Sequence, residues 1–326
     1  MIKNKSLFFI VFTFFIAMSL KTLCANYIFV SNENSDTITI LDDKNKKIVK
    51  SISTGGRPRD MKLSKDKTKL YIVVSEENHI AILDLNKLEI SGFIETGDDP
   101  EIFDISPNGK ILAVSNEDDN ELTIIDLNTK KILKSIKNVG VEPEGVNFSP
   151  DGKLVFVTSE GTNSVIIIDP WKQEIINEVL VGNRPRRGIF VNDGSEYWVS
   201  NELNGSVTII NTQKLNIIKT ISFSVKGIKD QDITPVDFAY SKKSDKIFVT
   251  LGSANHVAVV NAKTYAVEKN ILVGSRVWGA ALTKNDKELI VTNGNSDDIS
   301  IIDLKKLVAI SSIPVGRTPH TVRVLK

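Results

Sequence analysis

The chain has 326 residues, of which 41% are hydrophobic, and its 41 lysines and arginines nearly balance 40 aspartates and glutamates. A formal net charge of +1, spread along the sequence, argues against the strongly basic surface that binds nucleic acid or an anionic membrane. Three histidines and one cysteine are too few for the usual zinc sites, and the motifs for covalent haem and for a nucleotide phosphate loop are absent. We therefore expect no cofactor, no metal site and no nucleic-acid partner.

Residues 1–25 have the pattern of a secretory signal peptide. Two lysines precede an uncharged run over residues 7–20, which is shorter than the ~20 apolar residues needed to span a bilayer. We expect cleavage after Ala25 and export to the periplasm or the medium, with no stable membrane insertion afterwards. Residues 26–326 would then form the mature protein.

A repeat of roughly 43 residues organises the rest of the chain. Each unit contains four β-rich runs of four to seven residues, separated by turn sequences such as Ser106-Pro-Asn-Gly. Four short strands per unit without helical periodicity indicate the blade of a β-propeller, and seven units use the whole mature chain. An apolar run ends in each unit at an anchor residue: Ser31, Ser75, Ser115, Thr158, Ser200, Thr250 and Thr292. A second run ends at Asp42, Asp84, Asp126, Asp169, Asn211, Asn261 and Asp303.

The two ends of the chain belong to one blade. The first β-rich run begins at Tyr27 and has the pattern of the second strand of a blade. The last run begins at Pro319 and has the pattern of an innermost strand without its three partners. We expect these segments to pair, because closing the ring removes exposed sheet edges. The predicted fold is all-β: one seven-bladed propeller domain over residues 26–326, with four antiparallel strands per blade.

The repeat pattern resembles the YVTN-type β-propeller. Within that group, three stretches resemble the PQQ-dependent catabolism-associated β-propeller family: Arg184-Pro-Arg, Ser200-Asn-Glu-Leu-Asn-Gly-Ser-Val, and the segment from Leu251 through Trp278. The resemblance covers the mature chain. It implies an exported accessory protein of a pyrroloquinoline-quinone alcohol-oxidising system and an ABC transporter, without a catalytic motif and without binding of the quinone itself. The last repeat departs by placing His320 where an aromatic residue is expected.

The arginines are the strongest indication of a site. All eight lie in a Gly-x-x-Pro loop or in the innermost strand that follows it, and these loops surround one mouth of a propeller's channel. Trp278 would add a stacking surface there. The predicted ligand- or partner-binding residues are Arg57, Arg59, Arg184, Arg186, Arg187, Arg276, Trp278, Arg317 and His320. The same segments of other blades predict an acidic side formed by Asp99, Glu101, Glu142 and Glu144.

Two interpretations of the arginines remain open. In the first, they bridge neighbouring blades by pairing with glutamates that recur two residues after the Ser/Thr anchors: Glu33, Glu77, Glu117, Glu160 and Glu202. In the second, they bind a carboxylate- or phosphate-bearing ligand, or an acidic protein surface. An insertion at residues 222–234 should overhang this mouth. Its Phe223, Val225 and Ile228 are expected to be exposed, either as a docking or lid element or as a plain surface loop.

Three functions fit the sequence. The first is a monomeric, exported, non-catalytic binding or scaffold propeller whose partner is a periplasmic protein or a small anionic ligand. The second is a lactonase-like propeller hydrolase with a channel metal, which would need Asp, Glu and Asn to converge in innermost strands that read as mostly apolar. The third is a d1-haem-type tetrapyrrole-binding propeller, which would need an axial ligand, and His320 is the only histidine expected at the mouth. No catalytic residue is assigned.

Overall fold

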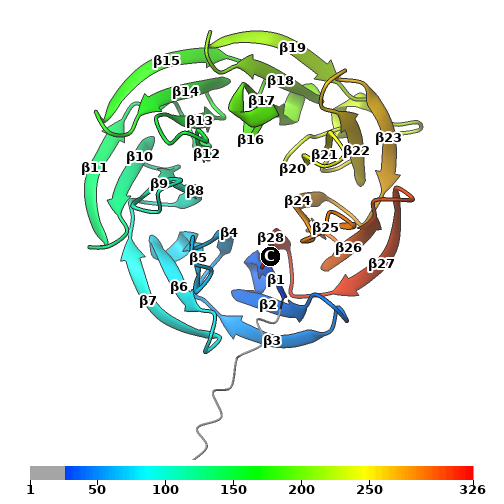
Figure 1. The fold of residues 1–326 in the computed structure, drawn as a ribbon, viewed down its shortest axis with the longest axis horizontal. Helices are drawn as coiled ribbons and strands as arrows, with labels where there is room; N and C mark the ends of the chain where they lie inside the picture. The colour runs from blue at the N-terminus through cyan, green and yellow to red at the C-terminus, as the bar shows by residue number, and fades with distance from the viewer. Residues whose placement is uncertain (1–25, 326) are drawn as a thin grey trace, which may run out of the picture.

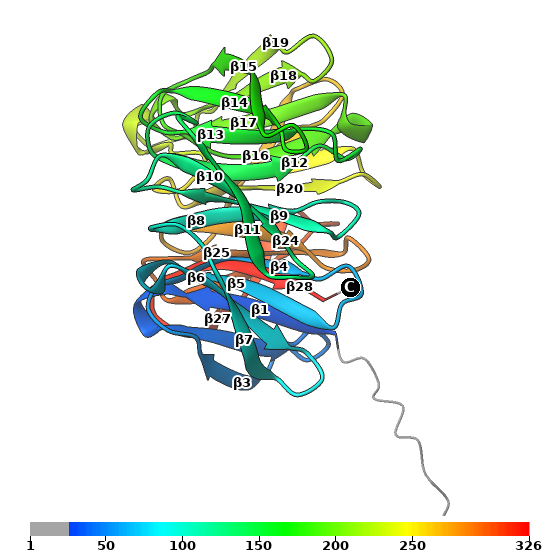
Figure 2. The ribbon, with the colours of Figure 1, turned by 90° about the vertical axis from the view of Figure 1, so that its left-hand side faces the viewer.

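The computed structural model describes residues 26–325, so the expected signal peptide lies outside the described part. Seven sheets, each of four antiparallel strands, surround a central axis, which confirms the predicted propeller (Figure 1). Seen from the side, the ring is a short cylinder, and the innermost strands run through its thickness (Figure 2). We number the blades 1 to 7 from the sheet that contains the N-terminal strand.

The first and second strands of each blade lie nearest the axis. The innermost strands of blades 1 to 7 are β28 (Pro319–Val324), β4 (Pro58–Leu63), β8 (Pro100–Ile105), β12 (Pro143–Phe148), β16 (Pro185–Val191), β20 (Phe238–Ser241) and β24 (Val277–Leu282). The second strands are β1 (Tyr27–Asn32), β5 (Lys69–Val74), β9 (Ile111–Asn116), β13 (Val155–Ser159), β17 (Glu196–Asn201), β21 (Lys246–Thr250) and β25 (Glu288–Asn293).

The third and fourth strands complete each blade outward. The third strands are β2 (Thr37–Asp42), β6 (His79–Asp84), β10 (Glu121–Asp126), β14 (Ser164–Asp169), β18 (Ser206–Asn211), β22 (His256–Asn261) and β26 (Asp298–Asp303). The outer strands are β3 (Ile48–Ser53), β7 (Glu89–Glu95), β11 (Lys131–Lys137), β15 (Glu174–Leu180), β19 (Asn216–Ser222), β23 (Val267–Leu272) and β27 (Val308–Pro314). Five short 3-10 turns are η1 (Glu33–Ser35), η2 (Ser75–Glu77), η3 (Asn192–Gly194), η4 (Glu202–Asn204) and η5 (Asp230–Asp232). No helix among residues 26–325 is long and apolar enough to cross a membrane.

The hydrophobic core lies between the blades. Seven clusters of buried apolar side chains each combine residues of two neighbouring blades. This arrangement explains the sequence pattern, because second and third strands are covered on both faces and read as continuous apolar runs. Trp198 is fully buried, as its position in an apolar strand run predicts.

The ring closes as predicted, through pairing of the two ends of the chain. Strand β28 pairs antiparallel with β1, with Val322 opposite Val30 and Val324 opposite Ile28. Val322 and Val324 of β28 belong to the cluster between blades 7 and 1. Blade 1 is therefore assembled from two segments almost 300 residues apart in sequence.

The repeating anchors have a structural role in every blade. Each Ser or Thr hydroxyl donates a hydrogen bond of 2.6–2.8 Å to a main-chain carbonyl in the innermost strand segment of the next blade. The second anchors cap the turns before the outer strands, because each Asp or Asn oxygen accepts the N–H groups two and three residues further on. The hydroxyl bonds thus fix each innermost strand against its neighbour.

The insertion between β19 and β20 differs from the expectation. Phe223 and Val225 are buried, and Ile228 packs against the same cluster between blades 5 and 6. The expected exposure was wrong because a longer loop can fold its apolar side chains back over a gap between two blades. The insertion therefore extends the core and offers no apolar docking surface.

Candidate functional site

The Gly-x-x-Pro loops share one backbone device at the predicted mouth. In six blades the residue at the last position before the innermost strand has a left-handed conformation, with φ between 44° and 58°. Its N–H donates a hydrogen bond of 2.8–3.2 Å to an Asp or Asn side chain about one half-repeat earlier. The backbone strain is therefore held by a side chain of the preceding blade. The six residues are Arg57, Asp99, Glu142, Arg184, Arg276 and Thr318. We call this set the rim.

Two residues further along, the side chains meet around the axis. All but one of these positions are buried, with relative exposures of 0–6%, whereas Trp278 is partly exposed. We call this second set the inner ring. Its members are Arg59, Glu101, Glu144, Arg186, Val236, Trp278 and His320. The inner ring closes this end of the channel.

The buried arginines of the inner ring are bound by carboxylates from several blades. Arg59 pairs with Glu101 of blade 3 and lies 3.2 Å from Glu33 of blade 1. Arg186 pairs with Glu160 of blade 4 and lies 3.2 Å from Glu144 and 3.7 Å from Glu202. These contacts support the interpretation in which the arginines bridge blades.

The rim arginines keep part of their surface free. The side chains of Arg57, Arg184 and Arg276 are 37%, 46% and 31% exposed, although each also contacts a carboxylate. Arg317 is exposed at the neighbouring loop position and donates to the carbonyl of Asn34 at 2.6 Å. Glu142 is exposed at the rim. The structure thus divides the predicted mouth residues into buried and accessible groups.

Two arginines lie deeper than the sequence suggested. Arg187 points below the inner ring, where Asp237 lies 3.1 Å away, and Arg323 lies further along β28, 2.6 Å from Asp60. Both side chains line the channel interior. Position along the innermost strand, and not membership of the loop, therefore decides which arginines reach the mouth.

The recurring glutamates have three different environments. Glu33, Glu160 and Glu202 contact arginines, as one interpretation predicted. Glu77 instead accepts the N–H of Gly56, at 3.1 Å. Glu117 lies beside Glu101, and both belong to a group with Asp99 whose carboxylate oxygens are within 4.8 Å of one another. That group could hold a metal ion.

Blades 6 and 7 lack a glutamate at the equivalent position. Gly252 and Gly294 lie two residues after the anchors Thr250 and Thr292, so these positions supply no glutamate to the inner-ring residues that follow them. Those residues are Trp278 and His320, whose rings contact edge to face with centroids 4.7 Å apart.

The guanidinium groups of Arg276 and Arg186 lie 5.4 and 5.7 Å from the Trp278 ring centroid. We call Arg184, Arg276 and Trp278 the Arg–Trp sector.

Carboxylates outnumber arginines on the opposite side of the mouth. Two arginines, Arg57 and Arg59, face four acids there: Glu33, Asp99, Glu101 and Glu117. Burial, with Glu144 and Glu117 nearby, raises the pKa of Glu101 well above its ordinary value although Arg59 opposes this. Burial and Glu144 also raise the pKa of Glu117. At pH values above the ordinary glutamate pKa, the folded protein therefore keeps protons on Glu101 and Glu117 that the unfolded chain releases.

The other ionisable groups of the inner ring respond differently to their surroundings. Burial raises the pKa of Glu160 to about 7, against the influence of Arg186. For Glu144, burial acts to raise the pKa, but Arg186 and Arg59 together lower it. Burial, followed by the charges of the nearby arginines, lowers the pKa of His320 well below its ordinary value. His320 is therefore neutral in the folded protein.

Glu117→Gln should change how stability depends on pH. The raised pKa means that folded Glu117 still holds its proton above pH 4.5, where the unfolded side chain loses it, so this residue's contribution to stability falls as pH rises. We expect the variant to match the wild type near pH 5 and to melt at a higher temperature near pH 8. Thermal unfolding across that range measures the difference, with exposed Asp118→Asn as control. A variant less stable than the wild type at pH 8 would refute the raised pKa.

The channel below the inner ring contains a cavity of about 200 Å³. Its wall combines charged side chains with apolar ones from six innermost strands. The charged residues are Asp60, Lys62, Arg187, Asp237 and Arg323, and the larger apolar ones are Ile102, Val146, Ile189 and Phe238. Sequence reasoning missed this site and expected mostly apolar residues in the innermost strands. Alternation along each strand was the available signal, because every second side chain faces the axis.

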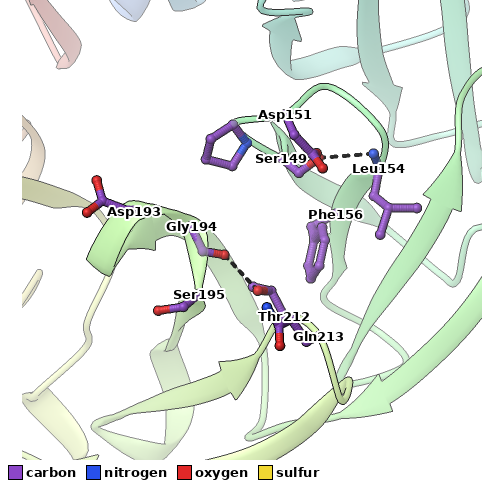
Figure 3. A pocket seen from close by; sticks show the side chains of 10 residues that line it. Ser149, Asp151, Leu154, Phe156, Asp193, Gly194, Ser195, Thr212 and Gln213 are labelled. Carbon is purple, nitrogen blue, oxygen red and sulfur yellow. Dashed lines mark hydrogen bonds between the residues drawn. The ribbon is translucent and has the colours of Figure 1, made fainter.

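A second hollow of about 290 Å³ lies on the face opposite the mouth, between turns of blades 4 and 5 (Figure 3). Its polar groups are engaged within their own blades: the Ser149 hydroxyl accepts the N–H of Leu154 at 3.0 Å, and the Thr212 hydroxyl donates to the carbonyl of Gly194 at 2.6 Å. This hollow therefore presents few free groups to a ligand.

Comparison with known families decides the relationship of the chain. Residues 111–326, about two thirds of the sequence, match the model of the cytochrome D1 heme domain. The chain belongs to the cytochrome D1 heme domain family. Residues 16–151 also match the YNCE-like beta-propeller model, which supports the predicted propeller repeats. No curated protein matches the chain.

Solved structures share the fold of this cytochrome D1 heme domain relative at low identity. Kuenenia stuttgartiensis hydrazine synthase has a TM-score of 0.76 at 19% identity, over 84% of this chain and 91% of that one. The periplasmic gluconolactonase PpgL of Pseudomonas aeruginosa has 0.77 at 16%, over 92% and 99%. The dihydro-heme d1 dehydrogenase NirN has 0.68 at 13%, over 92% and 75%. These likenesses establish the fold.

The family implies a haem, but the residues at this mouth do not fit one. His320 is 1% exposed, and its two ring nitrogens lie 3.5 Å from a guanidinium nitrogen of Arg187 and 3.1 Å from the hydroxyl of Thr321. The cavity beneath, at about 200 Å³, is smaller than the ~300–1,000 Å³ typical of pockets for drug-sized ligands. A planar macrocycle would have to displace the buried ion pairs of the inner ring to reach His320.

Proposed function

We propose that this protein is a non-catalytic binding propeller that takes an anionic group of a ligand or partner at the Arg–Trp sector. The observation that carries the proposal is the exposure of two arginines of this sector, because the side chains of Arg184 and Arg276 are 46% and 31% open to solvent. Glu202 is nearly buried, and Arg184, Arg186 and Arg276 approach it at 3.5, 3.7 and 3.3 Å. Glu160 also contacts Arg184 and Arg186, so what the sector offers an anion is the solvent-facing N–H groups of Arg184 and Arg276.

The surroundings of the sector favour an incoming carboxylate or phosphate. Arg276 also donates to the hydroxyl of Ser253 at 2.8 Å, which orients its guanidinium beside Trp278. The indole N–H of Trp278 has no hydrogen-bond partner among the described residues. Since Gly252 and Gly294 stand where five other blades carry glutamate, blades 6 and 7 add no carboxylate from these positions to repel an anion.

Arg276→Gln tests this proposal. A fluorescent tri-glutamate peptide should bind the wild type at low ionic strength, and the variant should bind it about tenfold more weakly, because one charge-assisted contact is lost. Fluorescence anisotropy measures both affinities. Arg317→Gln is the matched control, since it removes an exposed arginine from another loop of the same face.

A second variant adds charge without removing an arginine. Gly294→Glu restores the glutamate that five other blades carry, and an added Cβ would find its nearest neighbour, the carbonyl of Arg276, at 3.6 Å. We expect this variant to fold and to lose binding of the tri-glutamate peptide. Unchanged affinity in both Arg276→Gln and Gly294→Glu would refute the Arg–Trp sector as the binding site.

The cellular context is part of the same proposal. The pattern of residues 1–25 supports export, and PpgL, which shares the fold, is a periplasmic protein. The sequence resemblance supports an accessory role beside PQQ-dependent alcohol oxidation and an ABC transporter. Recovery of a periplasmic partner with the wild type but not with Gly294→Glu would support this context, and equal recovery with both would oppose it.

A lactonase-like hydrolase is the second candidate function. The observation that favours it is the group Asp99, Glu101 and Glu117, which could hold a metal ion near the mouth. Against it, Arg57 lies 3.3 Å from Asp99, and Arg59 pairs with Glu101, so two of the three acids are already neutralised. Hydrolysis of a gluconolactone that requires added Ca²⁺ or Mg²⁺ and is lost in Glu117→Gln would establish this function.

A further inference from the structure

The channel is accessible from the end opposite the arginine mouth. Along the innermost strands, the first two positions after the loop are almost all buried, whereas the fifth position becomes accessible in six blades. These accessible residues are Lys62, Asp104, Asn147, Ile189, Ala281 and Arg323. The inner ring is therefore the floor of a blind channel, and the cavity of about 200 Å³ lies inside it.

Two charged side chains in this cavity have atoms without partners. Asp60 is completely buried, and although one of its oxygens accepts a hydrogen bond from Arg323 at 2.6 Å, its Oδ2 has none. Arg187 is 6% exposed and donates through its terminal nitrogens, but its Nε has no acceptor among the described residues. Asp60 and Arg187 both line the cavity, so its wall contains one acceptor group and one donor group that are not fully hydrogen-bonded, which favours a polar occupant.

The charges of the lining define the occupant further. Arg323 pairs with Asp60, Arg187 pairs with Asp237, and Lys62 lies 3.4 Å from Asp104, so the wall is electrically balanced. A ligand with net charge would disturb that balance in a confined space. A ligand with one group of each sign would satisfy Asp60 with a cationic donor and Arg187 with an anionic acceptor.

We propose that the blind channel binds a small zwitterion, an α-amino acid being the simplest case. Its ammonium group contacts Asp60 Oδ2, its carboxylate accepts from Arg187 Nε, and its side chain lies against Ile102 and Ile189. The cavity admits a molecule of several non-hydrogen atoms and no more, because one water takes ~30 Å³ of liquid volume. This site is separate from the Arg–Trp sector and does not depend on it.

Calorimetric titration of the full-length protein with L-serine tests the proposal. We expect saturable binding of L-serine, and weaker binding of acetate and of ethanolamine, which each carry one of the two charges. Asp60→Asn keeps an acceptor for Arg323 but removes the negative charge, and should weaken L-serine binding at least tenfold. Ile189→Phe narrows the accessible end without changing a charge and should also weaken binding.

Arg317→Gln is the control, because it lies on the opposite face and should bind L-serine as the wild type does. Absence of L-serine binding at ~10 mM would overturn the proposal. Wild-type affinity in Ile189→Phe would overturn it as well, even if Asp60→Asn fails to fold. Acetate binding as tight as L-serine binding would replace the zwitterion with a simple anion.

Discussion

Removal of residues 319–326 should abolish cooperative folding. The deleted segment contains β28, which supplies the innermost strand of blade 1 and two valines of the cluster between blades 7 and 1. Its loss would expose the edge of β1, break the hydrogen bond from the Thr321 N–H to the Ser31 hydroxyl, and leave Asp60 without Arg323. We expect an aggregating chain with no sharp transition by circular dichroism.

A permuted chain separates loss of the strand from loss of its position. When residues 319–325 are joined by a short turn in front of residue 26, the same strand can pair with β1 from the other end of the chain. This variant should regain a cooperative transition. A truncated protein that melts like the wild type would show that pairing of the two ends does not hold the ring.

Arg186→Ala should lower the free energy of unfolding by ~3–5 kcal/mol. The side chain is 8% exposed and lies among Glu144, Glu160 and Glu202, which are 3%, 2% and 6% exposed. Removing it leaves several buried carboxylates short of a countercharge, and loss of one partner of a buried pair costs far more than the intact pair contributes. Urea unfolding followed by fluorescence measures the change.

Arg276→Ala is the control for Arg186→Ala, because it removes an accessible arginine in place of a buried one. Arg276 is 31% exposed, and Glu202 keeps two other arginines when it is removed. We therefore expect a loss of ~1 kcal/mol or less, as for other solvent-accessible pairs. Similar losses for both variants would contradict the division into structural and accessible arginines.

The blades could be predicted from the sequence because each repeat contains its own turn and strand signals. Turn residues, apolar runs and the Ser/Thr anchors recur with nearly constant spacing, so strand number, strand order and closure between Tyr27 and Pro319 follow from the chain alone. The anchors also indicate a contact between blades that the sequence analysis did not predict. A hydroxyl at the end of an apolar strand in every unit indicates a repeated hydrogen bond, and the structure shows that it joins neighbouring blades.

The mouth could be predicted in composition but not in accessibility. Spacing places Arg59, Arg186 and His320 at one level of the channel, yet whether they face solvent depends on how closely seven blades approach the axis. The left-handed conformation of Arg57 and Arg184 could not be predicted from the sequence either. Arginine has no preference for this conformation, and a side chain of the previous blade stabilises it by accepting the backbone N–H. Pairing across blades is a property of the closed ring.

Two titrations on three proteins test most directly whether the two ends of the channel are separate binding sites. Wild type, Arg276→Gln and Asp60→Asn are each titrated with the tri-glutamate peptide and with L-serine. We predict that Arg276→Gln loses the peptide and keeps L-serine, while Asp60→Asn loses L-serine and keeps the peptide. If either variant bound both ligands more weakly to the same degree, the two ends would not be separate sites, which would contradict both proposals.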